Sequence, residues 1–520
     1  MLFNSYEFTL VFLPITLLLY FLLHQANMAR MTVAMLVVAS LFFYGWWNPA
    51  YLLLITASIL INFTIGTQLV RSNHAGRKGR KPMLVAGLIF NVASIAYFKY
   101  ATFIVDNVAL LTGSDFTIEA IVLPLAISFF TFQQIAFLID SYRGETKELD
   151  FLNYCLFVSF FPQLIAGPIV HHKEMMPQFR DVANRHPRVG NFAIGLTIFA
   201  LGLFKKVVLA DTAALYGSPV FDAAANGETI MFFQAWQGAL SYTLQLYFDF
   251  SGYSDMAIGA ARLFGIRLPI NFNSPYRAKN IADFWRRWHM TLSRFLRDYI
   301  YIALGGNRKG PVRRYSNLMA TMLIGGLWHG AGWTFVIWGG LHGLYLVLHQ
   351  GWGWLRRGLL SALPDTGLWG STTARALTLL SVIVGWVFFR ATSFDAALSV
   401  LSGMAGLNGA ALPYIFSSIL PDSLVTGLNS LGVQFSTGGG QRFTEAWLVI
   451  ISGSIICLFM PNTLQLVRRY RPAILEKSSQ LAITRLVWRP SLGWSAITAL
   501  LLITGILSLS RVSEFLYFQF

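Results

Sequence analysis

The stretch YSNLMATMLIGGLWHGAGWTFVIWGGLHGLYLVLHQGWGWL, from Tyr315 to Leu355, contains no Asp, Glu, Lys or Arg. As one helix it would be about 60 Å long, twice the roughly 30 Å of a bilayer's hydrocarbon core. The stretch must therefore break. The glycines of residues 325–332 mark the place, because glycine weakens a helix and lets backbones approach closely. The sequence thus predicts two membrane helices that meet near His329.

Similar apolar runs recur along the whole chain. Of the 520 residues, 55% are hydrophobic and 12% are charged, about half of the roughly 25% charge that is usual in soluble domains. Runs long enough to cross a bilayer occupy residues 8–23, 31–46, 50–70, 83–98, 119–139, 151–170, 190–210, 231–264, 316–349, 376–390, 444–460 and 493–510. We therefore expect an all-α, polytopic membrane protein with about eleven to thirteen transmembrane or re-entrant helices.

The basic residues indicate an orientation in the membrane rather than a nucleic-acid partner. The formal net charge is +16, but Lys and Arg gather in short loops between apolar runs, chiefly at 71–81, 308–314 and 468–489. Such loops are typically cytoplasmic. If the uncharged stretch rises from the loop that ends at Arg314, His329 lies about 22 Å along a helix axis, near or beyond the bilayer midplane.

No linker divides the chain into soluble domains, so residues 1–520 are expected to form one membrane domain with its core at 120–400. Residues 404–442 carry many glycines and few charges. We predict that they form an extracytoplasmic loop.

A metal site is not expected. Only Cys155 and Cys457 are present, which supports neither a disulfide framework nor a thiolate site. His171 and His172 are adjacent, so on a helix they point about 100° apart and make a poor metal pair. We expect both histidines in a solvated connector.

Two carboxylates stand in an otherwise apolar segment, YFDFSGYSD at 247–255. An ionisable group in a membrane span costs about 2.5 to 3.5 kcal/mol on insertion scales and normally faces a partner or a cavity. Asp249 and Asp255 therefore either serve catalysis or lock helices together through Arg262, Arg267 or Arg277.

Residues 283–298, DFWRRWHMTLSRFLRD, place apolar and charged side chains on different sides at helical spacing. The pattern predicts a basic amphipathic helix at the membrane surface or lining an aqueous funnel. Its arginines either hold phospholipid head groups or attract the phosphates of a cytosolic donor such as a coenzyme thioester. The candidates for that second role are Arg286, Arg287 and Arg294. His289, on the flank of the apolar face, could reach a buried cavity.

His329 is the candidate reacting group. A buried histidine is more often a core residue than a catalyst, but this one is flanked by the indole of Trp328 and by small residues that leave room for a substrate. A neutral imidazole can take a proton from a hydroxyl as it attacks a thioester, which typically contributes about 10² to 10⁴ in rate. No serine-hydrolase elbow, phosphate-binding loop or dinucleotide motif is present. The residues therefore favour acyl transfer over hydride or phosphoryl transfer.

These residues resemble the membrane-bound O-acyltransferase family. The resemblance rests first on Trp328-His329-Gly330 in an apolar, glycine-rich span, preceded by FWRRWHMTLS at 284–293. Further segments are similar to the bacterial polysaccharide-modifying branch of that family, above all its alginate-modifying members: FLP at 12–14, FFYGWW at 42–47, FFPQLIAGPI at 160–169, FDFSGYSD at 248–255 and FLYFQF at 515–520. The likeness covers most of the chain and is strongest between 120 and 350.

The resemblance implies many helices around a central funnel and an enzyme of the bacterial inner membrane. It implies His329 as the essential histidine and His289 as the second one. Trp328 and the three arginines are the candidates for contact with the donor. Acetyl-CoA is then a cytosolic substrate rather than a bound cofactor. The acetyl group would pass, through periplasmic acetyltransferase partners, to an exopolysaccharide. Alginate is the first candidate, and cellulose, peptidoglycan and teichoic acid are alternatives.

Two other classes of function compete with this interpretation. A transporter or flippase for an acidic polysaccharide or its lipid carrier would use the arginines as a binding path, but such proteins are often built from repeats, and none is visible here. A scaffold subunit of a secretion complex would tolerate replacement of both His289 and His329. Membrane lipids are expected contacts in every case.

Overall fold

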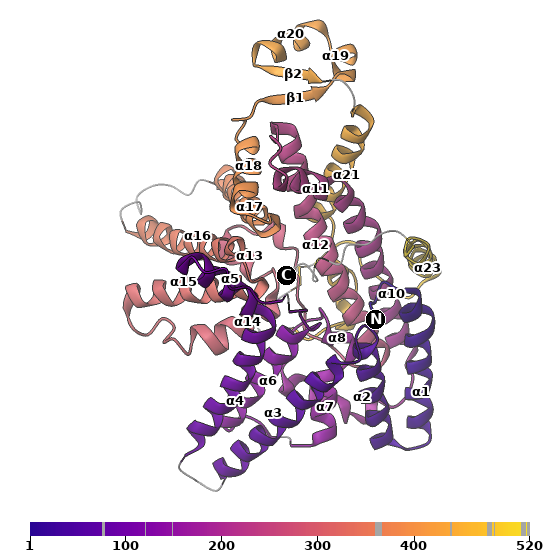
Figure 1. Ribbon diagram of the computed structural model, residues 1–520. Helices are drawn as coiled ribbons and strands as arrows, with labels where there is room; N and C mark the ends of the chain where they lie inside the picture. Colours follow the sequence, from indigo (N-terminus) through magenta and orange to yellow (C-terminus); the bar gives the residue numbers. More distant parts are fainter. Residues whose placement is uncertain are drawn as a thin grey trace.

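The computed structural model describes residues 1–74, 79–119, 121–147, 149–358, 367–436, 439–475, 481–482, 484–510 and 516. Parts of the basic loops 71–81 and 468–489, of segment 404–442 and of the C-terminal segment 515–520 lie outside the described residues. The described chain is almost wholly helical, with two short strands (Figure 1). The predicted all-α class is confirmed.

The N-terminal third forms the indigo and purple helices of Figure 1. Its elements are η1 (Glu7–Phe12), α1 (Leu13–Gln25), α2 (Ala29–Gly45), α3 (Tyr51–His74), α4 (Arg80–Ile95), η2 (Ala96–Tyr100), α5 (Ala101–Thr112), α6 (Ile127–Tyr142), α7 (Phe151–Ser159), α8 (Phe161–Leu164), α9 (His172–Phe179) and η3 (Val182–Asn184).

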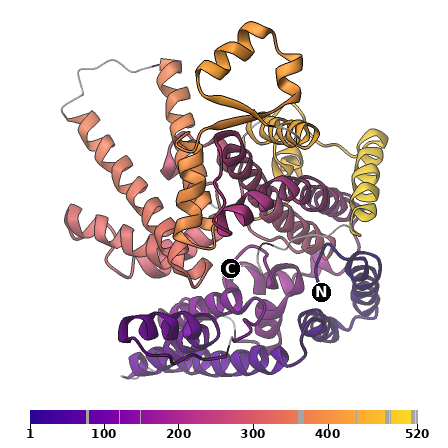
Figure 2. The ribbon, with the colours of Figure 1, turned by 45° about the horizontal axis from the view of Figure 1, so that its top comes forward.

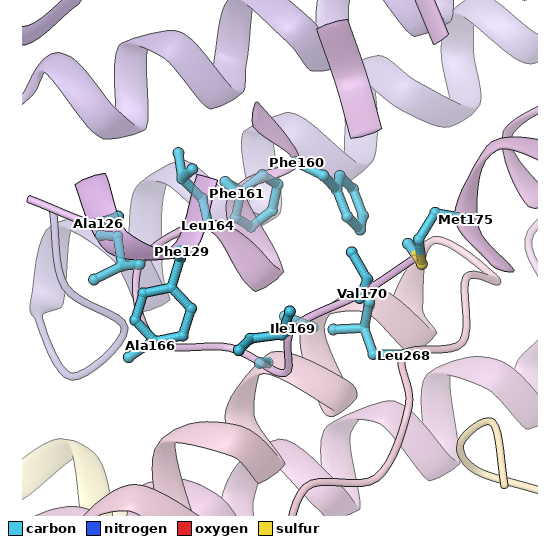
Figure 3. Close-up of a cluster of buried hydrophobic side chains, with 14 of the residues drawn as sticks. Ala126, Phe129, Phe160, Phe161, Leu164, Ala166, Ile169, Val170, Met175 and Leu268 are labelled. Atoms are coloured by element: carbon cyan, nitrogen blue, oxygen red, sulfur yellow. The ribbon is translucent and has the colours of Figure 1, made fainter. Parts of the chain in front are cut away.

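The apolar run at 151–170 is not one helix, because the chain breaks at Phe160 between α7 and α8. Proline is tolerated in the first turn of a helix but not in its interior, and Pro162 stands in the first turn of α8. The chain after this break is buried: Figure 3 shows Phe160, Phe161, Ile169 and Val170 in a cluster of apolar side chains. The cluster brings the segment from α8 to α9 together with Ala126 and Phe129 at the start of α6 and with Leu268.

The middle of the chain supplies the centre of the molecule. Its elements are α10 (Val189–Phe204), η4 (Lys205–Ala210), α11 (Asp211–Ala225), α12 (Phe232–Leu263), η5 (Pro275–Arg277), α13 (Ile281–Trp285), α14 (Met290–Phe295), η6 (Leu296–Tyr301), α15 (Gly310–His329) and α16 (Trp333–Arg357). Helix α12 runs through the middle and packs against α10 and α11 (Figure 1).

The C-terminal part covers the other side of α12 and carries a small lobe. Its elements are α17 (Gly367–Arg390), α18 (Phe394–Met404), β1 (Ala410–Pro413), α19 (Ile415–Ile419), α20 (Asp422–Ser430), β2 (Val433–Ser436), α21 (Gly440–Phe459), α22 (Thr463–Leu466), η7 (Arg468–Tyr470) and α23 (Leu492–Leu507). Strands β1 and β2 pair in parallel, from Ala410 opposite Val433 to Pro413 opposite Ser436. With α19 and α20 they form the lobe that projects from the helices (Figure 2). That the lobe faces the outside stays a prediction.

Six helical stretches of the described chain are long and apolar enough to cross a membrane: Glu7–Gln25, Tyr51–Asn73, Arg80–Thr112, Val189–Ala225, Gly370–Arg390 and Gly440–Phe459. Shorter apolar helices lie at Ala29–Gly45, Phe394–Met404 and Leu492–Leu507. Several of the expected membrane spans therefore coincide with helices that are long and apolar enough to cross a membrane. Helices α12, α15 and α16 instead combine apolar faces with buried polar residues.

The predicted break in the uncharged stretch is confirmed. Helix α15 ends at His329, residues 330–332 are extended or bent, and α16 begins at Trp333. The two helices pack directly on each other. A Cβ on Gly326 would overlap the carbonyl oxygen of Phe335, and one on Gly339 would overlap that of Met322. Small residues permit this close crossing, as they commonly do between membrane helices.

The expectation that His171 and His172 are solvated is wrong for His172, which is 3% exposed. Its Nε2 lies 3.3 Å from Thr146 Oγ1, because α9 packs against α7 and the loop that follows α6. Burial lowers the pKa of His172 to about 4, so this ring is neutral at pH 7.

We expect Gly339→Ala to lower the melting temperature of the purified protein in detergent, because the new methyl group would force α15 and α16 apart. Gly340→Ala is the matched control: its Cβ would meet only a Leu323 side chain at 3.6 Å, and alanine stabilises a helix over glycine by about 0.5–1 kcal/mol. Gly340→Ala should melt at the same temperature as the unmodified protein or higher. Equal melting of the two variants would contradict the close packing.

Candidate functional site

His329 lies at the inner end of α15, surrounded by aromatic rings. Its ring centroid is 4.9 Å from that of Trp328, 5.0 Å from Trp338 and 5.1 Å from Phe389. Only 7% of the residue is exposed. Its Nε2 is buried and forms no hydrogen bond within the described part of the chain. A nitrogen that is neither solvated nor paired is available to a group that enters the site.

His289 lies between α13 and α14, so the predicted continuous amphipathic helix over 283–298 is wrong. The chain leaves α13 after Trp285 and re-enters a helix at Met290. The cause is pairing with a distant segment: Asn273 N donates to Arg287 O, and Met290 N donates to Asn271 O. These bonds hold His289 at φ +42°, a left-handed conformation that costs a non-glycine residue about 1–3 kcal/mol and is concentrated at functional sites.

Asn271 fixes the ring of His289. The Nδ1 of His289 lies 3.0 Å from Asn271 Oδ1, which also accepts a hydrogen bond from Thr291 Oγ1 at 2.9 Å. Because an amide oxygen only accepts, Nδ1 carries the proton and Nε2 keeps its lone pair. That Nε2 is fully buried and has no partner among the residues that the structure describes. The ring centroids of His289 and His329 are 6.3 Å apart.

A narrow cavity touches His329. It is lined by Ala166, Leu246, Asp249, Phe250, Tyr253, Trp288, His329, Trp386, Phe389 and Leu516. A water-sized sphere can occupy about 20 Å³ of it, room for about one water molecule. His289 lies behind this wall, with its ring 4.8 Å from that of Phe250. The structure therefore brings the two predicted histidines together, but only His329 borders the cavity.

The two carboxylates of α12 pair with lysines, so the expected pairing with Arg262, Arg267 or Arg277 is wrong in its partners. Lys206 forms ion pairs with Asp249 and Asp211, and Lys205 pairs with Asp255 at 2.9 Å. Both lysines come from the π-helix η4, which packs against α12. The notion that these carboxylates hold helices together is supported, and Asp249 in addition forms part of the cavity wall.

The four residues predicted to contact a donor differ in their surroundings. Arg287 pairs with Asp283 at 2.9 Å, and Arg294 forms two bonds to Glu174, at 2.6 and 3.0 Å. Arg286 is exposed and forms no ion pair with the described carboxylates. Trp328 is 4% exposed and borders both histidine rings. Arg286 is thus the arginine best placed to meet a solvent-borne phosphate, whereas Arg287 and Arg294 already neutralise carboxylates.

Sequence reasoning missed Asn271, Trp338 and His342 as parts of this site. His342 is fully buried, its two ring nitrogens have no partner among the described residues, and its ring lies 4.9 Å from that of Trp338. A signal was present, because Trp338 and His342 stand one helical turn apart in the uncharged stretch. No feature of the sequence around Asn271 indicates that it belongs to the site.

The site has the parts of a proton-transferring centre and no recognisable metal site. Two imidazoles stand in a buried aromatic environment, each with a buried nitrogen that has no partner among the described residues. Within the described residues no group of three His, Cys, Asp or Glu side chains could hold a metal ion. Such an arrangement can take a proton from a hydroxyl and return it to a leaving group.

Comparison with known proteins identifies the class of enzyme. The model of the MBOAT, membrane-bound O-acyltransferase, family matches residues 84–359. The chain belongs to this family and is an O-acyltransferase, as predicted.

Three similar proteins are named after the polymers that they modify. The peptidoglycan O-acetyltransferase of Helicobacter pylori is 47% identical over 80% of this chain and 82% of its own. The probable alginate O-acetylase AlgI of Azotobacter vinelandii is 37% identical over 100% of both chains. The teichoic acid D-alanyltransferase of Streptococcus thermophilus is 31% identical over 44% of this chain and 57% of its own.

We expect Lys206→Met to destabilise the protein by about 3–5 kcal/mol, because it leaves Asp211 and Asp249 buried without their cation. Arg297→Met is the control: Arg297 pairs with Asp298 while 53% exposed, and exposed pairs contribute about 0–1 kcal/mol. Melting in detergent compares the two. If both variants melt alike, the Lys206 cluster does not hold η4 to α12.

Proposed function

We propose that this enzyme transfers an acetyl group from cytosolic acetyl-CoA toward a polysaccharide outside the inner membrane, with His329 at the reacting centre. One observation carries the proposal. The imidazoles of His329 and His289 lie with their ring centroids 6.3 Å apart in a buried aromatic site, each with a buried nitrogen that has no hydrogen-bond partner among the described residues, in a chain of the O-acyltransferase family.

The reaction that suits this site is attack of a hydroxyl oxygen on the thioester carbonyl. His329 takes the proton of the hydroxyl as the new C–O bond forms. The C–S bond then breaks, and the departing thiolate receives the proton from the imidazolium, which restores the neutral ring. His289, held by Asn271 with Nε2 unprotonated, positions the reactants or exchanges the proton with His329. The hydroxyl belongs to the polymer or to a periplasmic partner protein that completes the transfer.

The narrow cavity supports a small acyl group. Space for about one water-sized sphere beside His329 suits a two-carbon acetyl group with little rearrangement, whereas a fatty acyl chain would need a long channel. Arg286, exposed beside α13, is the first candidate to receive the phosphates of coenzyme A, because a guanidinium binds phosphate oxygens well. Arg287, Arg294 and Trp328 would support that contact.

Two polymers are supported as acceptors by different observations. Alignment over the full length with a probable alginate O-acetylase favours alginate. The higher identity to a peptidoglycan O-acetyltransferase favours peptidoglycan. Base-labile acetate, measured on each polymer from hosts that lack their own acetylase and express this chain, decides between them.

We expect purified His329→Ala to lose acetyl-CoA turnover by about 10² or more, because it removes the general base. His289→Ala should also lose most activity while it inserts normally into the membrane. His186→Ala is the control, since His186 is exposed in the connector before α10. Release of free coenzyme A measures the rate. Unchanged turnover in His329→Ala would contradict the assignment of His329 as the general base.

A further inference from the structure

The carbonyl groups at the end of α15 obtain their hydrogen bonds from a distant part of the chain. The last four carbonyls of a helix have no partner within it, and a following residue in a left-handed conformation often supplies one. Here Gly330 is extended, at φ −161°. Its N–H reaches only Gly326 O, at 3.4 Å. The chain beyond His329 therefore leaves three carbonyls to be satisfied from elsewhere.

Two neighbouring residues of η2 satisfy them. Lys99 Nζ donates to Trp328 O at 2.6 Å and to His329 O at 3.1 Å. The hydroxyl of Tyr100 donates to Leu327 O. Each of the last three carbonyls of α15 thus receives a side-chain donor from one π-helical segment, a kind of segment often found at functional sites.

The start of α5 holds the other side of the same break. Trp333, the first residue of α16, donates its indole N–H to Asn107 Oδ1 at 2.8 Å. The ring of Phe103 lies 5.8 Å from the indole of Trp333. The segment 96–107 therefore contacts both the end of α15 and the start of α16. We call this segment the brace.

Lys99 forms no ion pair with a described carboxylate, so the two carbonyl oxygens are the partners that its amino group has in the described chain. An N–H donor at a helix C-terminus meets the negative end of the helix dipole. An ionisable side chain within a span as apolar as Arg80–Thr112 is nevertheless expensive, and such groups are usually kept for function.

We propose that Lys99 is the positioning residue for His329, and that the brace fixes the geometry of the reacting centre. Its effect on catalysis rests on the proposed function. Lys99 holds the peptide groups on both sides of the His329 Cα, so the imidazole stays aimed at the cavity and at His289. Without these two hydrogen bonds, the last turn of α15 frays and His329 loses this direction, although the helices remain in place.

The test compares Lys99→Met and Lys99→Arg with Lys81→Met, an exposed lysine at the start of the same span. Backbone amide exchange, measured by mass spectrometry in nanodiscs, should rise in Lys99→Met by about tenfold or more in peptides covering 326–333, because the side-chain hydrogen bonds to the Trp328 and His329 carbonyls are lost there. Exchange in α10 and α12 should stay unchanged. Lys99→Arg should restore protection, since a guanidinium can donate to both carbonyls, and Lys81→Met should behave as the unmodified protein.

The kinetic prediction is a fall in kcat for Lys99→Met of about tenfold or more with KM little changed, because the donor site is intact while the reacting group is misaligned. Unchanged exchange at 326–333 would overturn the proposal. So would faster exchange in every helix, which would make Lys99 a general structural residue. If the unmodified protein shows no turnover, the proposed function fails, but the exchange result still decides whether Lys99 holds His329.

Discussion

The structure depends on one constraint: a polypeptide that breaks inside an apolar interior must find partners for the freed peptide groups. Helices α15 and α16 meet at such a break, at residues 330–332. Gly326 and Gly339 let the two helices touch, and Lys99 and Tyr100 satisfy the exposed carbonyls. The break therefore serves two purposes. It fits a long uncharged stretch into the fold, and it leaves an imidazole at a helix end that is held from outside.

Buried charged side chains likewise have partners close by. Lys206 lies between Asp211 and Asp249, and all three side chains are removed from solvent. Burial of any one of these charges without a partner would cost free energy, whereas together the three side chains join η4 to the central helix α12. Asp249 also borders the cavity next to His329, so the ion cluster that ties the helices together shapes the wall of the reacting site. Aromatic rings supply most of the remaining wall and bury the imidazoles.

The sequence predicted features that depend on neighbouring residues, and it did not predict contacts between segments that are far apart in the chain. The break near His329 follows from length and glycine content, and the family follows from short motifs. The helix predicted over 283–298 failed because Asn271 and Asn273 pair with the backbone of 287–290, which no periodicity reveals. The partners of Asp249 and Asp255 were misassigned, because the lysines of η4 reach them only after α10 and α12 pack. Lys99 stood out only as an ionisable residue in an apolar span, and its partners could not be read from the sequence, since they exist only once α15 lies beside η2.

The central claim is that acyl transfer takes place at His329, inside the break. Cryo-electron microscopy of the protein in a lipid nanodisc with a non-hydrolysable acetyl-CoA analogue tests it most directly. The account predicts the acyl group in the widened cavity beside His329, with the place of the attacking hydroxyl between the acyl carbonyl carbon and His329 Nε2, within about 2.6–3.2 Å of that nitrogen or one water away from it. An acyl group bound elsewhere, with the cavity beside His329 still closed, would contradict it.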